Sequence, residues 1–379
     1  MRVRARFRRG GATWVAGGVA VALLAAGCSH GSAETAIANP GCPRVSYAPS
    51  PARGSLIIGL NSVWNNACNL NAIRAAGVRM ERLELSWPQV EPSPGHWRWA
   101  VYDKKIRTAA RHGITILPLM MGSPSWAGPA NSVAAPPSGF AEFVARAARR
   151  YGPGGSLWRA RARARVPYHP ATWFEIWNEP YLEQFSPGGP QPATYARLFK
   201  AAAVSGRNAN PRTRYLIAAD TSGLTVSKKP SPWVDPMYAA VPDLSRYIDG
   251  VAIHPYAARS PTIFTPGSES RFQFDRIQQL HQMFAAHGAA NKPFWITEVG
   301  WSTCPGSPDA CVSEADQAKY IAEVFAAVRG KYSQWVKALF LYNYRDSPAA
   351  TDPTDKEHWF GLIRRNGSPK PAWNTLRAQ

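Results

Sequence analysis

The sequence has few acidic residues, few cysteines and no apolar segment long enough to suggest a membrane-spanning helix. Its 379 residues include 24 Asp and Glu against 44 Lys and Arg, which gives a formal net charge of +20. Basic proteins often bind nucleic acid, but no nucleic-acid-binding motif is present and the chain begins like an exported protein, so we expect no such partner. Two explanations of the charge stay open. It favours contact with anionic wall polymers or an acidic glycan, or it reflects an arginine-rich composition without a function.

The N-terminal residues predict export. The arginine-rich residues 1–10 precede an apolar run rich in Gly and Ala at residues 12–27, and this run is typical of a signal peptide. It ends in Leu-Leu-Ala-Ala-Gly-Cys at residues 23–28, which resembles a bacterial lipobox with Ala25 in place of the usual Leu. The resemblance implies that Cys28 carries lipid. We expect a cell-surface lipoprotein held on the outer surface of the membrane, or a secreted protein.

Only five cysteines are present, and Cys28 is one of them. The remaining even number, in an oxidising compartment, favours two disulfides, Cys304 with Cys311 and Cys42 with Cys68. Their spacing matches no zinc pattern, so we expect no metal site. Residues 28–53 are rich in Ala, Ser, Pro and Gly and predict a flexible tether, which the Cys42–Cys68 bond would fasten to the following domain.

From residue 54 to residue 379, short apolar segments alternate with segments of helical character. This alternation predicts a parallel sheet, and the length suits one catalytic domain with the fold of a single (β/α)8 TIM barrel. An arginine-rich stretch at residues 158–165 predicts an exposed loop, with a polyanion contact as the alternative. We expect strands at residues 56–60, 78–85, 114–121, 173–179, 215–219, 247–254, 293–298 and 336–344, and helices at 69–76, 102–112, 138–151, 192–209, 270–287 and 313–329.

Two of these strands end in a carboxyl group. Residues 173–180 read Trp-Phe-Glu-Ile-Trp-Asn-Glu-Pro, and residues 294–301 read Phe-Trp-Ile-Thr-Glu-Val-Gly-Trp. Pro180 cannot donate to a sheet, so we expect the first strand to stop there and leave Glu179 at its end. The 119 residues from Glu179 to Glu298 allow three strand–helix units of about 40 residues, which places them on strands 4 and 7. We expect these two carboxyls to face each other across the barrel mouth, and Glu84 and Glu175 to be solvated.

These two motifs at this spacing resemble clan A of the retaining glycoside hydrolases, with families 5 and 39 closest in style, over residues 55–376. The resemblance implies Glu179 as acid/base and Glu298 as nucleophile, with the charge of Glu298 raising the pKa of Glu179. It implies no metal and no cofactor. It also implies supporting roles for Asn178 at the sugar 2-hydroxyl, Arg82 (or Arg79) beside the nucleophile, and His254 and Tyr256 along the site.

Aromatic side chains complete the expected site. Trp87, Trp126 and Trp301 occupy loop positions where a ring can stack on a sugar, and Tyr342 replaces a Trp that is common in the clan. We therefore expect a monomeric retaining O-glycoside hydrolase acting on an extracellular or cell-wall polysaccharide. Two alternatives stay open: a transglycosylase that uses the same residues, and a wall-associated lipoprotein that binds glycan without cutting it.

Overall fold

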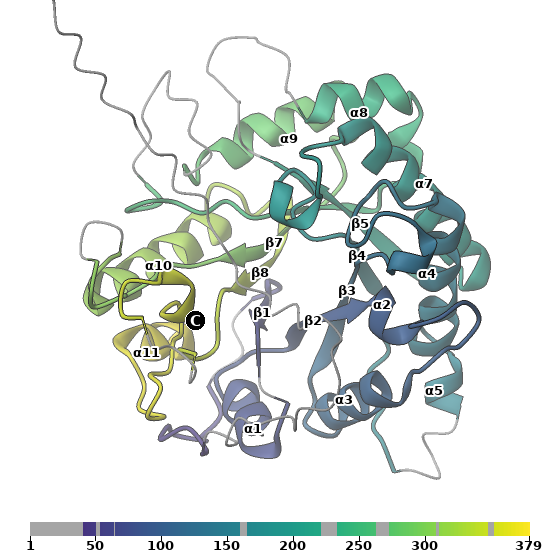
Figure 1. The fold of residues 1–379 in the computed structure, drawn as a ribbon. Coiled ribbons are helices and arrows are strands. Elements are labelled where there is room, and N and C mark those ends of the chain that lie inside the picture. Colours follow the sequence, from purple (N-terminus) through teal and green to yellow (C-terminus); the bar gives the residue numbers. More distant parts are fainter. Residues whose placement is uncertain are drawn as a thin grey trace, which may run out of the picture. The chain divides into compact units, whose positions relative to one another are not determined.

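Eight parallel strands form the centre of the fold. In the computed structural model each strand pairs with the next along the chain, and β8 pairs with β1, so the sheet closes into a barrel. The predicted (β/α)8 architecture is therefore confirmed (Figure 1). The strands are β1 (Ile57–Asn61), β2 (Met80–Ser86), β3 (Thr115–Met121), β4 (Trp173–Ile176), β5 (Arg214–Ala219), β6 (Gly250–Ile253), β7 (Phe294–Val299) and β8 (Val336–Leu341).

The structure describes residues 41–50, 54–63, 65–159, 165–220, 233–262, 273–307, 311–347 and 352–379. The predicted signal peptide and Cys28 lie outside these ranges, and so does most of the arginine-rich stretch. Within these ranges, no helix is both long and apolar enough to cross a membrane.

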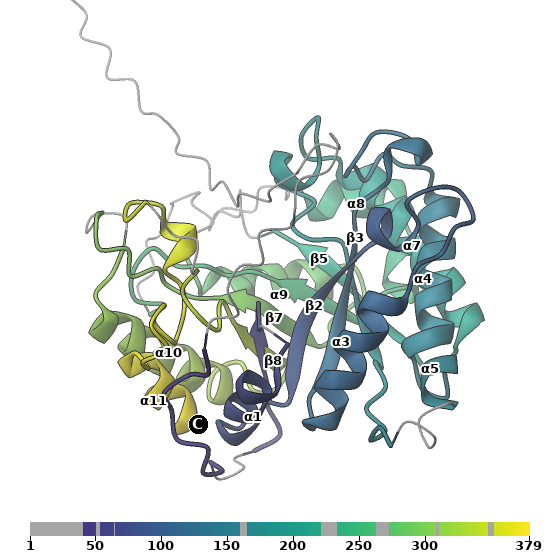
Figure 2. The same cartoon turned by 60° about the horizontal axis from the view of Figure 1, so that its bottom comes forward.

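Helices connect successive strands and lie on the outside of the barrel. Figure 1 shows α3, α4, α7, α9 and α10 around the ring of strands, and Figure 2 shows α11 beside α10, which it contacts. The helices are α1 (Ala67–Ala75), α2 (Trp87–Val90), α3 (Ala100–Arg111), α4 (Pro137–Tyr151), α5 (Ser156–Arg159), α7 (Pro192–Ala209), α8 (Val234–Ala240), α9 (Arg276–Ala286), α10 (Glu314–Arg329) and α11 (Pro371–Arg377), with short 3₁₀ helices η1 (Ser125–Ala127), η2 (Glu183–Phe185), η3 (Leu244–Arg246) and η4 (Lys356–His358).

The inside of the barrel is packed with apolar side chains rather than left open. Its core cluster consists of residues from six strands: Met80, Leu117, Leu216, Ala252, Trp295, Ala338 and Phe340. Gly59 on β1 makes room for one of them, because a Cβ at this position would lie 2.2 Å from the Phe340 ring. This filled interior forms a rigid base below the strand ends, where the functional side chains lie.

Several predicted boundaries were wrong in detail. The fourth strand ends at Ile176, before Glu179, and the sixth covers only Gly250–Ile253. Short helix α2 follows β2 directly and was not expected. Residues 158 and 159 belong to helix α5, so the start of the arginine-rich stretch is helical rather than extended.

The described part of the predicted tether is fastened to the barrel. Both expected disulfides form, with Cα atoms 5.5 Å apart in Cys42–Cys68 and 5.6 Å apart in Cys304–Cys311. Arg345 donates to the carbonyl oxygen of Gly41 at 2.8 Å, and Arg377 donates to that of Ser46 at 2.6 Å. Residues 41–50 of the predicted tether are therefore held against the barrel by arginine side chains and by the Cys42–Cys68 bond.

Candidate active site

The two strands with the acidic motifs bring their carboxyls to the same end of the barrel. Glu298 lies within β7, and Glu179 lies three residues after the last residue of β4. The chain turns sharply there, because Trp177 and Glu179 both adopt left-handed backbone angles, with φ of 68° and 37°. Non-glycine residues rarely take such angles, and those that do cluster at functional sites. The buried Trp177 ring fixes the turn by donating from Nε1 to the carbonyl oxygen of Phe185 at 2.7 Å.

Both carboxylate oxygens of Glu298 accept hydrogen bonds. Arg82 Nη1 donates to Oε1 at 2.5 Å, and the Tyr256 hydroxyl donates to Oε2 at 2.7 Å. Burial, reinforced by the charge of Glu298, raises the pKa of Tyr256 well above its usual value, so the phenol remains a donor. These contacts hold the carboxyl group of Glu298 in one orientation. The structure thus places Arg82 and Tyr256 directly against Glu298.

Arg82 on β2 joins several polar groups below the strand ends. Its Nε and Nη2 atoms donate to the two oxygens of Glu175 at 2.6 and 3.0 Å, and Nη2 also donates to Asn178 Oδ1 at 2.8 Å. Burial opposes the charge of Arg82, but Glu175 and Glu298 raise its pKa, so the guanidinium stays protonated. Arg79, the other candidate, bonds backbone carbonyl oxygens near α1 and not Glu298.

Glu175 was expected to be solvated, and this expectation was wrong. The residue is 1% exposed and forms the two-pronged ion pair with Arg82. Burial alone would raise the pKa of Glu175, but the charge of Arg82 and the hydrogen bonds to the carboxylate lower it to about 2. Glu84 is partly buried as well, and burial raises its pKa.

His254, which directly follows β6, lies close to both acidic residues. Its Nδ1 is 2.9 Å from Glu179 Oε1, and its Nε2 is 3.8 Å from Glu298 Oε1. Burial disfavours the imidazolium, but the charge of Glu298 and the carboxylates of Glu175 and Glu179 raise the pKa of His254 to about 9. One imidazole ring therefore lies close to both of the carboxyls that the sequence motifs pointed to.

The expected aromatic residues differ in how much of each ring is free. Trp87 is 0% exposed and packs on Phe143, and Trp301 is 3% exposed, so neither ring has a free face for a sugar. Those two expectations are corrected, because the rings belong to the hydrophobic core. Trp126 is 38% exposed and can still offer a face. Tyr342, directly after β8, lies edge-on to the Tyr256 ring with centroids 6.4 Å apart.

Sequence reasoning missed Glu357 on η4, which no motif marks. Burial raises the pKa of this carboxyl to about 7, and the charges of Glu298 and Glu179 add to the effect. Its Oε1 atom is buried and accepts no hydrogen bond within the described part of the chain. Glu357 is thus a further carboxyl, besides Glu175, whose charge is coupled to the pair.

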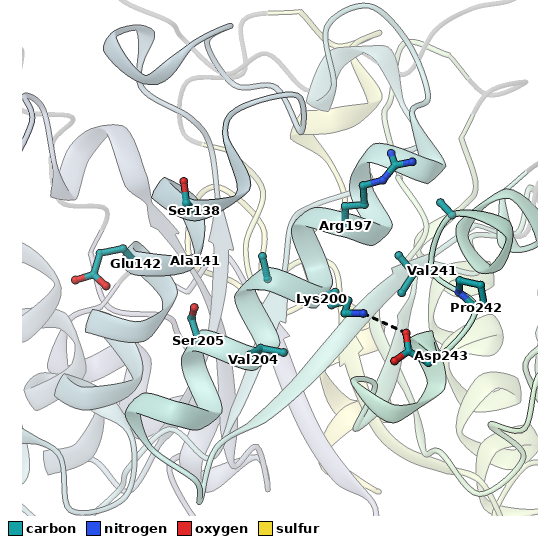
Figure 3. A pocket seen from close by; sticks show the side chains of 12 residues that line it. Ser138, Ala141, Glu142, Arg197, Lys200, Val204, Ser205, Val241, Pro242 and Asp243 are labelled. Atoms are coloured by element: carbon teal, nitrogen blue, oxygen red, sulfur yellow. Dashed lines mark hydrogen bonds and ion pairs between the residues drawn. The ribbon is translucent and has the colours of Figure 1, made fainter.

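A separate pocket of about 710 Å³ lies on the outside of the barrel between α4, α7 and the segment after α8 (Figure 3). Lys200 donates to Asp243 at 3.2 Å across it, as the dashed line shows. Its described lining includes no residue of the carboxyl site and no aromatic ring.

The described residues also contain no group of three or more His, Cys, Asp or Glu side chains that could hold a metal ion.

The chain was compared with known proteins. No protein-family model matches it, and no curated protein is significantly similar in sequence. Solved structures with the same fold include a family 39 glycoside hydrolase from Bacteroides cellulosilyticus WH2, with TM-score 0.65 and 21% identity over 89% of this chain and 64% of that one. The chain thus spans less than two thirds of that hydrolase.

Two further structures are similar over most of this chain. A monomeric β-xylosidase from Caulobacter crescentus CB15 has TM-score 0.60 and 18% identity, over 87% of this chain and 69% of that one. Xylanase B from Clostridium stercorarium F9 has TM-score 0.58 and 18% identity, over 87% of this chain and 100% of that one. At these identities the similarity establishes a shared barrel fold, and the activity has to be argued from the site.

Proposed function

We propose that this protein is a retaining glycoside hydrolase, with Glu298 as the nucleophile and Glu179 as the acid/base. The observation that carries the proposal is the unequal environment of the two carboxyls around one imidazole. Glu298 receives hydrogen bonds on both oxygens, including one from a guanidinium, as a nucleophile that must stay ionised requires. Glu179 is contacted at Oε1 by His254 and Tyr181, and neither partner is a permanent cation like the guanidinium of Arg82. A proton donor needs this freedom to change its protonation state.

The reaction follows from these two roles. Glu298 attacks the anomeric carbon while Glu179 gives a proton to the leaving oxygen, and a glycosyl ester on Glu298 results. Water then attacks the ester, Glu179 takes its proton, and Glu298 is released. The Oδ1 atom of Asn178 accepts from Arg82 at 2.8 Å, which leaves its amide nitrogen able to donate to the sugar 2-hydroxyl. Trp126 and Tyr342 are the proposed sugar-stacking rings.

We further infer that the substrate is an extracellular or cell-wall polysaccharide. The signal-like N-terminus, the lipobox-like end at Cys28 and the two disulfides support action outside the cytosol. On this view the enzyme is a cell-surface lipoprotein or a secreted monomer. The solved barrels of similar fold include proteins named β-xylosidase and xylanase, which makes plant-type and wall polysaccharides a reasonable first panel.

The test is reducing-sugar release from a panel of wall, capsule and plant polysaccharides, with ¹H NMR of the first product formed. We expect sugar release with retained anomeric configuration, and at least a 1,000-fold loss in Glu298→Gln, on the order seen when a catalytic group is removed. Transfer to added sugar acceptors without net hydrolysis would identify a transglycosylase. Binding to a glycan without any cleavage would contradict the proposal and favour a glycan-binding lipoprotein.

A further inference from the structure

Four side chains form a continuous hydrogen-bond chain that reaches the acid/base residue from below. Thr297 Oγ1 donates to Glu175 Oε1 at 3.0 Å, His254 Nε2 lies 3.1 Å from Thr297 Oγ1, and His254 Nδ1 lies 2.9 Å from Glu179 Oε1. Thr297 is fully buried and Glu175 nearly so. The two-carboxylate reaction scheme assigns no role to Thr297 or Glu175.

The ionised state of Glu175 determines which atom donates in each of these hydrogen bonds. Its carboxylate pairs with Arg82 through both oxygens and therefore stays ionised, which makes it an acceptor only. The single hydroxyl proton of Thr297 must then point at Glu175. Thr297 Oγ1 has only lone pairs left for His254, so the bond between them requires a proton on His254 Nε2.

With Nε2 protonated in every state, Nδ1 is the nitrogen of His254 that gains or loses a proton. Nδ1 faces Glu179 Oε1. If His254 is neutral, Nδ1 is an acceptor and Glu179 must be the protonated acid. If His254 is charged, Nδ1 donates and Glu179 is a carboxylate. In both arrangements one proton lies between Nδ1 and Oε1. Without this proton, a lone pair of Nδ1 would face a lone pair of Oε1.

We propose that Glu179 and His254 share one proton across the Nδ1–Oε1 bond, and that Thr297 and Glu175 are positioning residues that fix His254 for this role. The inference rests on the proposed function, because it assigns Glu179 as the proton donor. It adds that the proton given to the leaving group is stored on a pair of residues. The raised pKa of His254, to about 9, agrees with storage on the imidazole when Glu298 is ionised.

The position of Glu298 explains when the proton moves. Three acidic groups face His254: Glu175, Glu179 and Glu298, whose Oε1 lies 3.8 Å from Nε2. Arg82 is the cation paired with two of them, Glu175 and Glu298. The His254 side chain is only 4% exposed, so water screens these charges weakly. The charge of Glu298 favours the imidazolium, and loss of that charge on forming the ester removes this support.

The protons balance over the cycle. As the bond from Glu298 to the anomeric carbon forms and the glycosidic bond breaks, the shared proton passes through Glu179 to the leaving oxygen, and His254 becomes neutral. In this intermediate Nδ1 and Glu179 Oε1 face each other without a proton, which favours the return of a proton in the second step. In the second step water bonds to the anomeric carbon and the ester bond breaks. The proton from water returns to Glu179 and is again shared with His254.

The first test measures the free protein and needs no substrate. Long-range ¹H–¹⁵N spectra of histidine-labelled full-length protein, with the His254 signals assigned by their loss in His254→Gln, report the protonation of each ring nitrogen. We expect Nε2 to carry a proton throughout the pH titration, with only Nδ1 changing. A neutral His254 with its proton on Nδ1 would overturn the proposal, whether or not the protein proves to be a glycosidase.

The second test separates positioning from structural support. Thr297→Val removes the hydroxyl with little change in volume, and Thr297→Ser keeps it. We expect Thr297→Val to populate the other tautomer of His254 and to move the alkaline limit of kcat/KM down by about one pH unit, while Thr297→Ser resembles the wild type. Wild-type spectra and pH dependence in Thr297→Val would overturn the role of Thr297. If no substrate is cleaved, the tautomer of His254 in Thr297→Val alone tests the role of Thr297.

Discussion

At the scale of single residues, Glu298 and Glu179 differ in what holds them. Arg82 and Tyr256 fix both oxygens of Glu298, whereas the contacts of Glu179 converge on Oε1 and come from His254 and Tyr181. The distinction matters because a nucleophile must be aimed and charged, while an acid/base must release and regain a proton. It leads to different expectations for substitutions at the two positions.

Replacing Glu179 should affect substrates according to their leaving group. Glu179→Gln cannot donate a proton, so we expect a loss of about 100- to 10,000-fold in kcat/KM for natural sugars and alkyl glycosides. Aryl glycosides with acidic leaving groups need no protonation and should lose far less in the first step. The measurement is kcat/KM across a series of leaving groups. Equal losses for all of them would contradict the assignment.

Glu183→Gln is the matched control for this substitution. Glu183 lies on η2, four residues after Glu179, and its side chain is exposed. The same chemical change there should leave both the leaving-group dependence and kcat/KM within about twofold of the wild type, as for most surface substitutions.

Arg82 should matter for stability as well as for activity. Arg82→Lys keeps the charge, but a lysine cannot form the bidentate hydrogen bonds to Glu175 and also donate to Glu298. Breaking a buried ion pair of this kind costs about 3–5 kcal/mol. We expect the free energy of unfolding in urea to fall by up to that amount. An unchanged unfolding midpoint would show that the buried network contributes little.

The same network shows why some site residues could not be predicted from the sequence. Glu179 and Glu298 lie in recognisable motifs, but Glu175 looked like an ordinary strand residue. Its partner Arg82 is 93 positions away, and only barrel closure brings the two together. Glu357 and the burial of Trp87 were missed for the same reason, because both depend on how distant loops and helices pack.

At the scale of elements, the strands and helices were well predicted, and their ends were not. Apolar runs of four to seven residues correspond to strands in the structure, and α7 matches its predicted range of 192–209. The end of β4 was misplaced because Pro180 marked only the last position a strand could reach. The left-handed angle at Trp177 ends the strand earlier, and side-chain packing rather than local propensity sets that angle.

The two disulfides give a prediction at this scale. Cys42–Cys68 closes a longer loop than Cys304–Cys311, with separations of 26 and 7 residues. Closing these loops lowers the conformational entropy of the unfolded chain, which stabilises the folded state by about 3.5 and 2.5 kcal/mol respectively. We therefore expect the paired Ser substitution at Cys42 and Cys68 to lower the free energy of unfolding more than that at Cys304 and Cys311. Urea denaturation of the two double variants measures this difference, and the reverse order would contradict it.

At the scale of the whole molecule, buried acids should make stability depend on pH. Burial raises the pKa of Glu81 on β2 to about 8, against an ordinary value of 4.5. A raised pKa means that the folded state holds the proton more tightly than the unfolded chain. The contribution of Glu81 is thus fully present below about pH 4.5 and is lost as the pH rises towards 8. Glu175, with a pKa near 2, acts oppositely, and its stabilisation is lost as the pH falls from 4.5 towards 2.

Glu81→Gln separates the first of these effects from the rest. The amide cannot ionise, so the stability of the variant relative to the wild type should improve as the pH rises from 5 to 8. Free energies of unfolding from urea titrations at several pH values measure this trend. A difference between the two proteins that does not change with pH would show that Glu81 is not a buried neutral acid.

In the proposed mechanism Glu298 forms a covalent bond with the sugar. Intact-mass spectrometry after incubation with a panel of 2-deoxy-2-fluoro glycosyl fluorides tests for this bond, with Glu298→Gln as the control. We expect a mass increase of one fluorosugar, mapped to the peptide that contains Glu298 and absent from the control. An adduct on another residue, or cleavage of substrate with inverted configuration and no adduct, would exclude Glu298 as the nucleophile.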